Sequence, residues 1–161
     1  MKKGFTLIEL LVAIGIIGIV LGISTLLFPK IISNSRVDEA TSKIVMFLET
    51  AMRNSLTKGY ENAPIDPKYR LYGVKIENLG SSYKISLCPY EGVVSDNLVV
   101  VDDECEFFNI DSKIDLITNS NEVIFNKRGT TGKNFSITLK NHYNYTKKIT
   151  ISGAKINVIN E

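Results

Sequence analysis

An unbroken apolar segment lies close to the N-terminus of the chain. Residues 10–28 are apolar or small apart from Ser24 and Thr25, and a short polar stretch with Lys2 and Lys3 precedes them. A helix over residues 5–28 is about 36 Å long at 1.5 Å per residue, and the hydrocarbon core of a bilayer is about 30 Å thick. The pattern therefore predicts one membrane-spanning helix, and the lysines favour an N-terminus in the cytoplasm with the rest of the chain outside it.

Beyond Pro29, where we expect a kink, the apolar spacing becomes that of a one-sided helix. Small and apolar residues recur at intervals of three and four, with charged residues between them. The recurring residues are Val37, Ala40, Ile44, Leu48, Ala51 and Ser55. This periodicity predicts an amphipathic helix within residues 29–58, and Lys58-Gly59 is a typical C-terminal stop signal.

The remainder of the chain, residues 59–161, favours strands because its apolar and polar positions alternate. We expect about eight strands, with turns at the segment NLGS and at Ser152-Gly153. The candidate segments are LYGVKIE, SYKISLC, NLVVV, CEFFNI, KIDLIT, EVIFN, NFSITLK and the hairpin KKITISGAKINVI. The predicted fold class is α+β: a long N-terminal helix with a transmembrane half and an amphipathic half, packed on an antiparallel β-rich head of two sheets or a sandwich.

Composition adds little to this picture. The 161 residues leave room for about one domain beside the apolar segment, and 19 basic against 17 acidic residues identify no partner. Glu9 is the one ionisable residue between Lys3 and Lys30. A charge in the membrane costs about 2.5 to 3.5 kcal/mol on insertion scales, so its carboxylate needs a partner or a route to water. It can snorkel to the headgroups, or, in a chain cut before Phe5, pair with the new N-terminal amine of its own helix at i,i+4 spacing.

The string KKGFTLIELLVAIGIIGIVLGI resembles the leader and first helix of type IV prepilins and type II secretion pseudopilins. The resemblance implies that residues 1–4 are a leader, that prepilin peptidase cuts between Gly4 and Phe5, and that Phe5 is then N-methylated. A small Gly4 suits such a cut because it lets a peptidase approach the backbone closely. Glu9 would become the fifth mature residue and would pair, during assembly, with the Phe5 amine of a neighbouring subunit.

The same resemblance implies the partners and the location of the chain. The partners are prepilin peptidase, other pilin or pseudopilin subunits, an inner-membrane assembly platform and, before assembly, the lipid bilayer. The precursor would cross the cytoplasmic membrane once with its head outside, and would then enter a pilus or a pseudopilus. In residues 5–28, the filament-core helix, Gly15, Gly18 and Gly22 would permit close helix packing or local melting.

Three strings in the head give a finer resemblance, to the GspH/FimT type of minor pseudopilin or minor pilin. They are YGVKIENLGSSYKISLCP, FNKRGTTGKNFSITL and KKITISGAKINVI, with Lys155 at a position where such heads often have arginine. The resemblance implies a structural minor subunit rather than an enzyme, and no cofactor. A chain that keeps the anchor but never polymerises, and serves as an extracytoplasmic binding module, is the alternative from another class.

Little in the head points to catalysis or metal binding. His142 is the only histidine and lies in a polar segment, and Cys88 and Cys105 lack the spacing of a zinc site. In an exported head these cysteines are a candidate disulfide, and two unpaired thiols in the core are the alternative. The segment KRGTTGK has two residues rather than four between its glycines, so we interpret it as a hairpin turn rather than a phosphate loop. Residues 102–104 are interpreted as a solvated acidic loop.

Charge is unevenly distributed along the head. Acidic residues dominate positions 91–115, and positions 127–155 contain seven bases and no acid. The bases are Lys127, Arg128, Lys133, Lys140, Lys147, Lys148 and Lys155. They could join successive filament subunits, or bind DNA in a competence pilus, or be solvated on strand edges.

Overall fold

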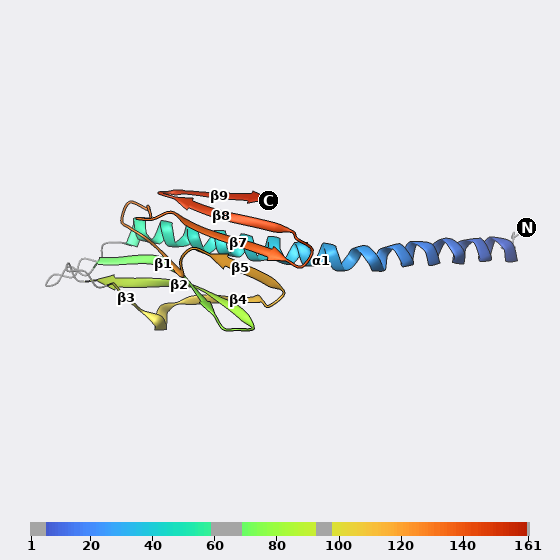
Figure 1. The fold of residues 1–161 in the computed structure, drawn as a ribbon, viewed down its shortest axis with the longest axis horizontal. Helices are drawn as coiled ribbons and strands as arrows, with labels where there is room; N and C mark the ends of the chain where they lie inside the picture. Colours follow the sequence, from blue (N-terminus) through green and yellow to red (C-terminus); the bar gives the residue numbers. More distant parts are fainter. Residues whose placement is uncertain (1–5, 59–68, 93–97, 161) are drawn as a thin grey trace, which may run out of the picture.

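The computed structural model describes residues 6–58, 69–92 and 98–160, which form a head with one long helix projecting from it (Figure 1). The helix α1 runs over Leu7–Lys58, and a 3₁₀ helix, η1, covers Asp102–Glu104. The strands are β1 (Tyr69–Asn78), β2 (Ser82–Gly92), β3 (Val99–Val100), β4 (Glu106–Asp111), β5 (Ile114–Thr118), β6 (Glu122–Phe125), β7 (Phe135–Asn141), β8 (Thr146–Ser152) and β9 (Lys155–Asn160).

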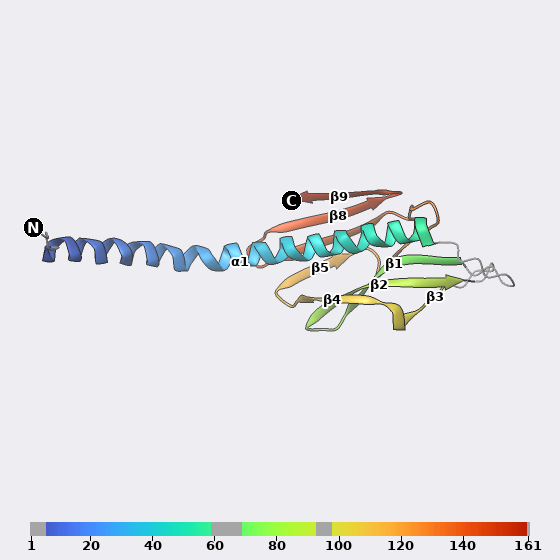
Figure 2. The same ribbon diagram turned by 180° about the vertical axis from the view of Figure 1, so that it is seen from behind.

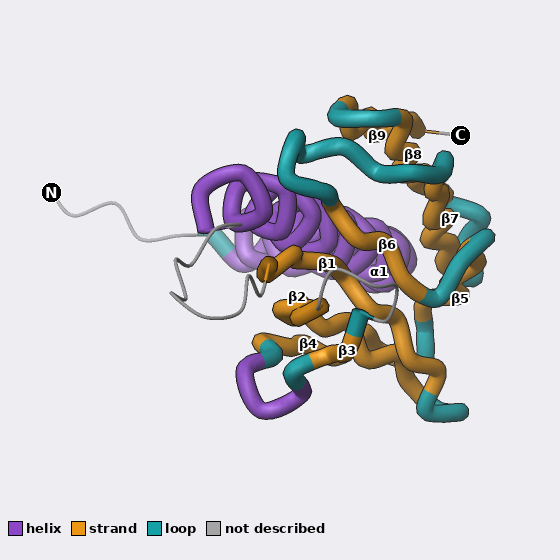
Figure 3. Tube along the Cα trace, turned by 90° about the vertical axis from the view of Figure 1, so that its left-hand side faces the viewer, coloured by secondary structure: helices purple, strands orange, loops and turns teal. Residues whose placement is uncertain are grey.

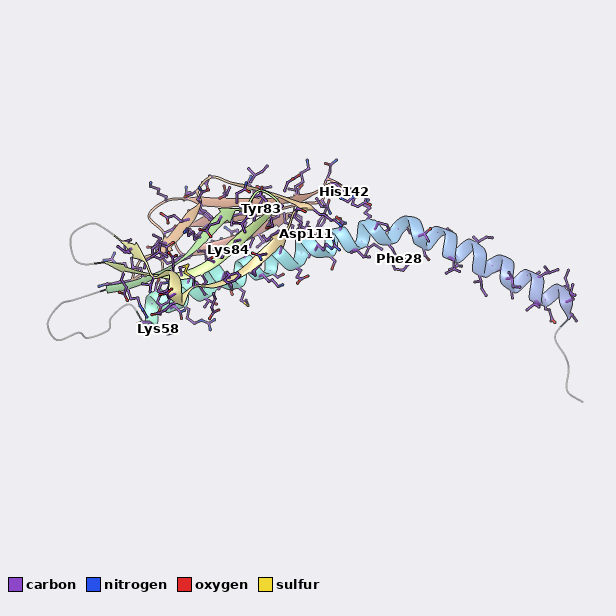
Figure 4. All side chains as sticks on the ribbon, turned by 90° about the horizontal axis from the view of Figure 1, so that it is seen from below. Phe28, Lys58, Tyr83, Lys84, Asp111 and His142 are labelled. Carbon is purple, nitrogen blue, oxygen red and sulfur yellow. A yellow bond between two sulfur atoms is a disulfide. The ribbon has the colours of Figure 1, made fainter. Side chains whose placement is uncertain are left out.

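Helix α1 is one continuous helix across the predicted transmembrane and amphipathic halves, with Pro29 inside it. The structure describes it as far as Lys58, the residue of the predicted stop signal, and residues 59–68 lie outside the described ranges. Figure 4 shows the axis changing direction near the labelled Phe28, the residue before the proline. Proline removes one backbone donor and crowds the preceding turn, so a bend here has a local cause.

The strands form two antiparallel sheets, which confirms the α+β expectation. In the first sheet the order is β3-β2-β1-β6, and β4 also pairs with β2. In the second sheet the order is β5-β7-β8-β9. Figure 3, viewed from the end of the head, shows the two sheets beside α1, and the helix lies in the angle between them. The second half of α1 is thereby enclosed on two sides.

The core forms where α1 meets both sheets. All six residues that the helical spacing singled out are buried, and Val37, Ile44, Leu48 and Ala51 have no exposed area. They pack with alternate residues of β1, β2, β7 and β8, because only one face of each strand can meet the helix. Ser55 is also buried, and its hydroxyl accepts the backbone N–H of Tyr72 at 2.8 Å.

Both predicted tight turns are present. Asn78 and Ser82 flank the β1–β2 hairpin, in which Gly80 has φ +84°, and Ser152 pairs with Lys155 around Gly153, with φ +63°. The segment KRGTTGK contains the predicted tight turn, in which the N–H of Asn126 donates to the carbonyl of Thr130 at 2.9 Å, but the turn does not join two paired strands, because β6 and β7 lie in different sheets. The segment instead crosses between the sheets. Only a single bridge, Phe125 to Thr131, resembles a hairpin there.

Candidate functional site

The first half of α1 is an apolar rod without a partner in the described part of the chain. The sixteen large apolar side chains described from Leu7 to Ile32 are 51 to 78% exposed. Figures 1 and 2 show this half extending away from the head on both views. We call residues 6–32 the projecting half. Burying one such side chain is worth about 1.5 to 3 kcal/mol, so leaving all of them in water would cost more than the 5 to 15 kcal/mol or so by which a domain is stable.

The projecting half suits a membrane. Within the described residues, α1 is long and apolar enough to cross a bilayer. The hydroxyl groups of Ser24 and Thr25 are also satisfied locally, since Ser24 donates to the carbonyl of Val20 at 2.8 Å and Thr25 to that of Gly22 at 2.9 Å. A hydroxyl bonded to its own helix exposes less unpaired polarity to lipid.

Glu9 forms a capping box with Thr6 at the start of α1. The backbone N–H and the hydroxyl of Thr6 both donate to Oε2 of Glu9 at 2.9 Å, and the N–H of Glu9 donates to the Thr6 hydroxyl at 3.3 Å. The spacing Thr-x-x-Glu before an apolar run is a known sequence signal for this cap. The cap was not among the predictions from the sequence. Among the described residues, Oε1 of Glu9 has no hydrogen bond, so one oxygen is available to another group.

Several residues that the resemblance singles out are not tested by the geometry. Gly4 and Phe5 lie outside the described residues. A Cβ atom added at Gly15, Gly18 or Gly22 would meet nothing within 4 Å, because no other described segment lies beside this half of α1. These glycines could allow close packing only if another helix lay beside them.

The head is attached to α1 by polar contacts that the sequence did not reveal. Asn141 is buried and donates from Nδ2 to Oδ1 of Asn34 at 2.9 Å. Asp38 accepts the hydroxyl of Tyr145 at 2.9 Å and binds Nζ of Lys147 at 2.8 Å. We call residues 33–38 of α1 the neck. These contacts fix the β7–β8 hairpin to the neck, more than a hundred residues away in sequence.

Cys88 and Cys105 form the disulfide that was considered from the sequence. The bridge lies across β2 and the start of β4, in a small cluster with Leu71 and Tyr90 on the face of the first sheet opposite the main core. It ties down the segment that carries β3 and η1. The disulfide is therefore part of the head's structure.

Residues 102–104, interpreted as an acidic loop, form the exposed helix η1. Glu104 binds Nη2 of Arg70 at 2.8 Å, and Glu91 lies 3.0 Å from the same nitrogen. The hydrogen bond from Arg70 to Glu104 is the main reason that the pKa of Arg70 lies above its ordinary value. Among the described residues, no three or more His, Cys, Asp or Glu side chains are grouped so that they could hold a metal ion.

The seven bases do not form one surface. Lys127, Arg128 and Lys133 lie on the crossing between the sheets, and Lys147 is engaged with Asp38. Lys140 alternates with the core-facing residues of β7 and therefore lies on the outer face of the second sheet, as does Lys148 on β8. Lys155 begins β9. His142 lies in the exposed β7–β8 turn, where its ring stacks on Tyr143 at 3.7 Å between centroids.

Comparison with known proteins finds a family relationship at the N-terminus. Residues 1–25 match the family model described as the prokaryotic N-terminal methylation motif. No curated protein and no solved structure gives a significant match. The match covers part of the segment that forms the projecting half. It fits a single-pass membrane-anchored precursor and favours a structural over a catalytic protein, and it supports a place for the chain in the type IV pilin-like family.

Proposed function

We propose that the chain is a structural minor pilin or pseudopilin that is processed by prepilin peptidase and assembled into a pilus-like or type II secretion filament. The observation that carries this proposal is the pairing of the methylation motif at residues 1–25 with a helix whose apolar half has no partner among the residues that the structure describes. Such a rod needs either lipid or other helices around it. The apolar half of a filament subunit is surrounded by lipid before assembly and by other helices after it.

Exchange of lipid for other helices gives little hydrophobic gain, since both surroundings are apolar. Association must then come from packing and from polar contacts between helices. Gly15, Gly18 and Gly22 lie on one side of α1 at spacings of three and four, and open space surrounds each of them. We infer that these residues allow neighbouring helices to approach closely.

Glu9 supplies the polar contact in this proposal. Thr6 occupies only Oε2 of its carboxylate, so Oε1 can accept the cationic amine that cleavage between Gly4 and Phe5 creates on a neighbouring subunit. The capping box holds the carboxylate close to the helix start, where such an amine would lie. Glu9 would thereby select the register in which a new subunit joins.

The head supports a minor rather than a major subunit. Its two antiparallel sheets on one helix agree with the GspH/FimT type of head that the sequence resembles. We propose that this head is displayed on the filament or at its tip, with the projecting half in the filament core.

The intact mass and N-terminal peptide of the protein from its native membrane test the proposal. We expect a chain that begins with N-methylated Phe5, and we expect replacement of Gly4 by a bulky residue to leave the unprocessed precursor. A functioning protein that retains Met1-Lys2-Lys3-Gly4 would instead support the anchored binding module that does not polymerise.

A further inference from the structure

The turn between β7 and β8, residues 142–144, is the part of the head that reaches farthest toward the projecting half (Figures 1 and 2). Asn141 holds this turn on two sides. Its Oδ1 accepts the backbone N–H groups of Tyr143 and Tyr145 at 2.9 and 3.0 Å, and its Nδ2 donates to Asn34 of the neck at 2.9 Å. The turn therefore has a defined height along α1, at the level of Asn34.

The turn between β4 and β5 is held in a similar way. Nη1 of Arg36 lies 3.3 Å from Oδ2 of Asp111, and the other oxygen of Asp111 accepts the N–H of Lys113 at 3.2 Å. Residues 111–113 therefore lie beside the neck at the level of Arg36. We call residues 111–113 and 142–144 together the rim of the head.

The rim lies very close to the end of the apolar surface. Asn34 follows Phe28 by six residues, or about 9 Å of helix. Ile31 and Ile32, which are 60 and 51% exposed, extend the apolar surface to within about 3 Å of Asn34 along the axis. The headgroup layer on each side of a bilayer is about 5 to 8 Å thick. A projecting half that spans the membrane thus brings the rim into contact with the headgroup layer.

The side chains of the rim suit that layer. Tyr143 is 38% exposed and stacks on His142, and tyrosine favours the membrane interface because its ring is apolar and its hydroxyl is polar. Lys113 of the rim is an exposed cation, and Lys30, near the end of the projecting half, is another. The acids of the same region are each held in an ion pair, Asp111 with Arg36 and Asp38 with Lys147.

We propose that the rim binds the headgroup layer of the bilayer, so that the head of the membrane-held precursor rests on the membrane surface in one orientation. This inference rests on the proposed function, since it requires the projecting half to lie in a bilayer. Exposed cations and an interfacial tyrosine would bind lipid phosphates and the glycerol region. A subunit that enters a filament must break this contact.

A single tryptophan can report the contact, because the chain contains no tryptophan of its own. The full chain with Tyr143→Trp is reconstituted into vesicles of phosphatidylethanolamine and phosphatidylglycerol, some of which carry lipids brominated near the glycerol end of the acyl chains. We expect the tryptophan to fluoresce at a shorter wavelength than it does in water. In the brominated vesicles we expect most of this fluorescence to be quenched. Val99→Trp is the matched control, because Val99 is 64% exposed at the opposite end of the head and should show neither effect.

The same tryptophan reporter tests whether the exposed lysines contribute to the contact with lipid. Replacing Lys30 and Lys113 by glutamine in the Tyr143→Trp chain should weaken the quenching, whereas Lys58→Gln, at the far end of α1, should not. Equal quenching of the Tyr143→Trp and Val99→Trp chains would overturn the inference. The absence of quenching in both, in chains that float with the vesicles, would also overturn it. Chains that fail to float with vesicles would contradict the membrane anchor of the proposed function as well, so the two failures are distinguishable.

Discussion

The ammonium group of Lys147 lies 2.8 Å from a carboxylate oxygen of Asp38, and this ion pair joins β8 to the part of α1 that leaves the head. The hydrogen bond to Asp38 is the main reason that the pKa of Lys147 is raised. The same carboxylate oxygen accepts the hydroxyl of Tyr145 at 2.9 Å. One acid of the helix thus holds two residues of the second sheet.

Replacing Asp38 with alanine should therefore loosen the head from the neck. The variant loses both contacts, and we expect a fall of about 1 to 2 kcal/mol in the free energy of unfolding. Urea unfolding of the full chain in mild detergent measures it. Glu49→Ala is the matched control, since Glu49 is exposed on the same helix and forms no ion pair within the described residues. Equal losses in the two variants would contradict the role given to Asp38.

The lowered pKa of Asp111 should make the head sensitive to acid. The backbone N–H of Lys113 is the main cause of the lowered pKa of Asp111, helped by the hydroxyl of Ser112 and the charges of Lys113 and Arg36. Because the pKa is lower in the folded chain than in the unfolded one, where it is about 3.9, the contribution is present above that pH and is lost as the pH falls through the folded-state value.

The urea midpoint of the native chain should then fall as the pH drops below about 4, with a shallower fall in Asp111→Asn. Asp103→Asn is the control, because Asp103 is exposed and has no ion pair with a described residue. A steeper or unchanged fall in the Asp111 variant would count against this assignment.

The disulfide should contribute substantially to the stability of the head. Cys88 and Cys105 are 17 residues apart, and closing a loop of this length is worth about 3 kcal/mol in the chain-entropy description. We expect the double variant Cys88→Ser, Cys105→Ser to unfold at a lower urea concentration, by about that free energy. A reductant should reproduce the loss in the native chain and leave the double variant unchanged. Insensitivity of the native chain to reductant would refute the prediction.

Gly73 occupies a position with no room for a side chain. A Cβ atom there would lie 2.6 Å from the carbonyl oxygen of Val123 and 2.9 Å from the ring of Tyr90. We expect Gly73→Ala to destabilise the head by about 1 to 3 kcal/mol, because β6 and the buried ring must both shift. At Gly132 the same addition would meet nothing within 4 Å, so Gly132→Ala should have little effect on the unfolding midpoint.

Substitutions at Thr6 and Glu9 should separate capping from assembly. Glu9→Gln keeps an oxygen that can accept the Thr6 donors but removes the charge, whereas Thr6→Ala removes the capping hydroxyl and keeps the charge. If Glu9 binds the amine of a neighbouring subunit, the glutamine variant should be processed but largely absent from sheared filaments, and Thr6→Ala should still assemble. Normal assembly of Glu9→Gln would leave capping as the role of Glu9.

The local pattern of the sequence was sufficient for the elements of this fold. The three- and four-residue spacing from Val37 to Ser55 identified the buried face of α1, because neighbours on a helix surface are always three or four residues apart. Alternation identified the strands, and Gly80 and Gly153 marked their turns, since both require a positive φ. The long apolar run identified the projecting half, because its length and composition can be read directly from the sequence.

Tertiary structure alone decided which elements meet. The segment KRGTTGK looks like a hairpin turn, but β6 pairs with β1 and β7 pairs with β5 and β8, because the two sheets diverge around α1. The bond between Asn34 and Asn141, like the pair of Asp38 with Lys147, joins residues more than a hundred positions apart, and no local spacing encodes such contacts. Periodicity records which side of an element is buried, whereas partners are chosen only when all the buried faces pack together at once.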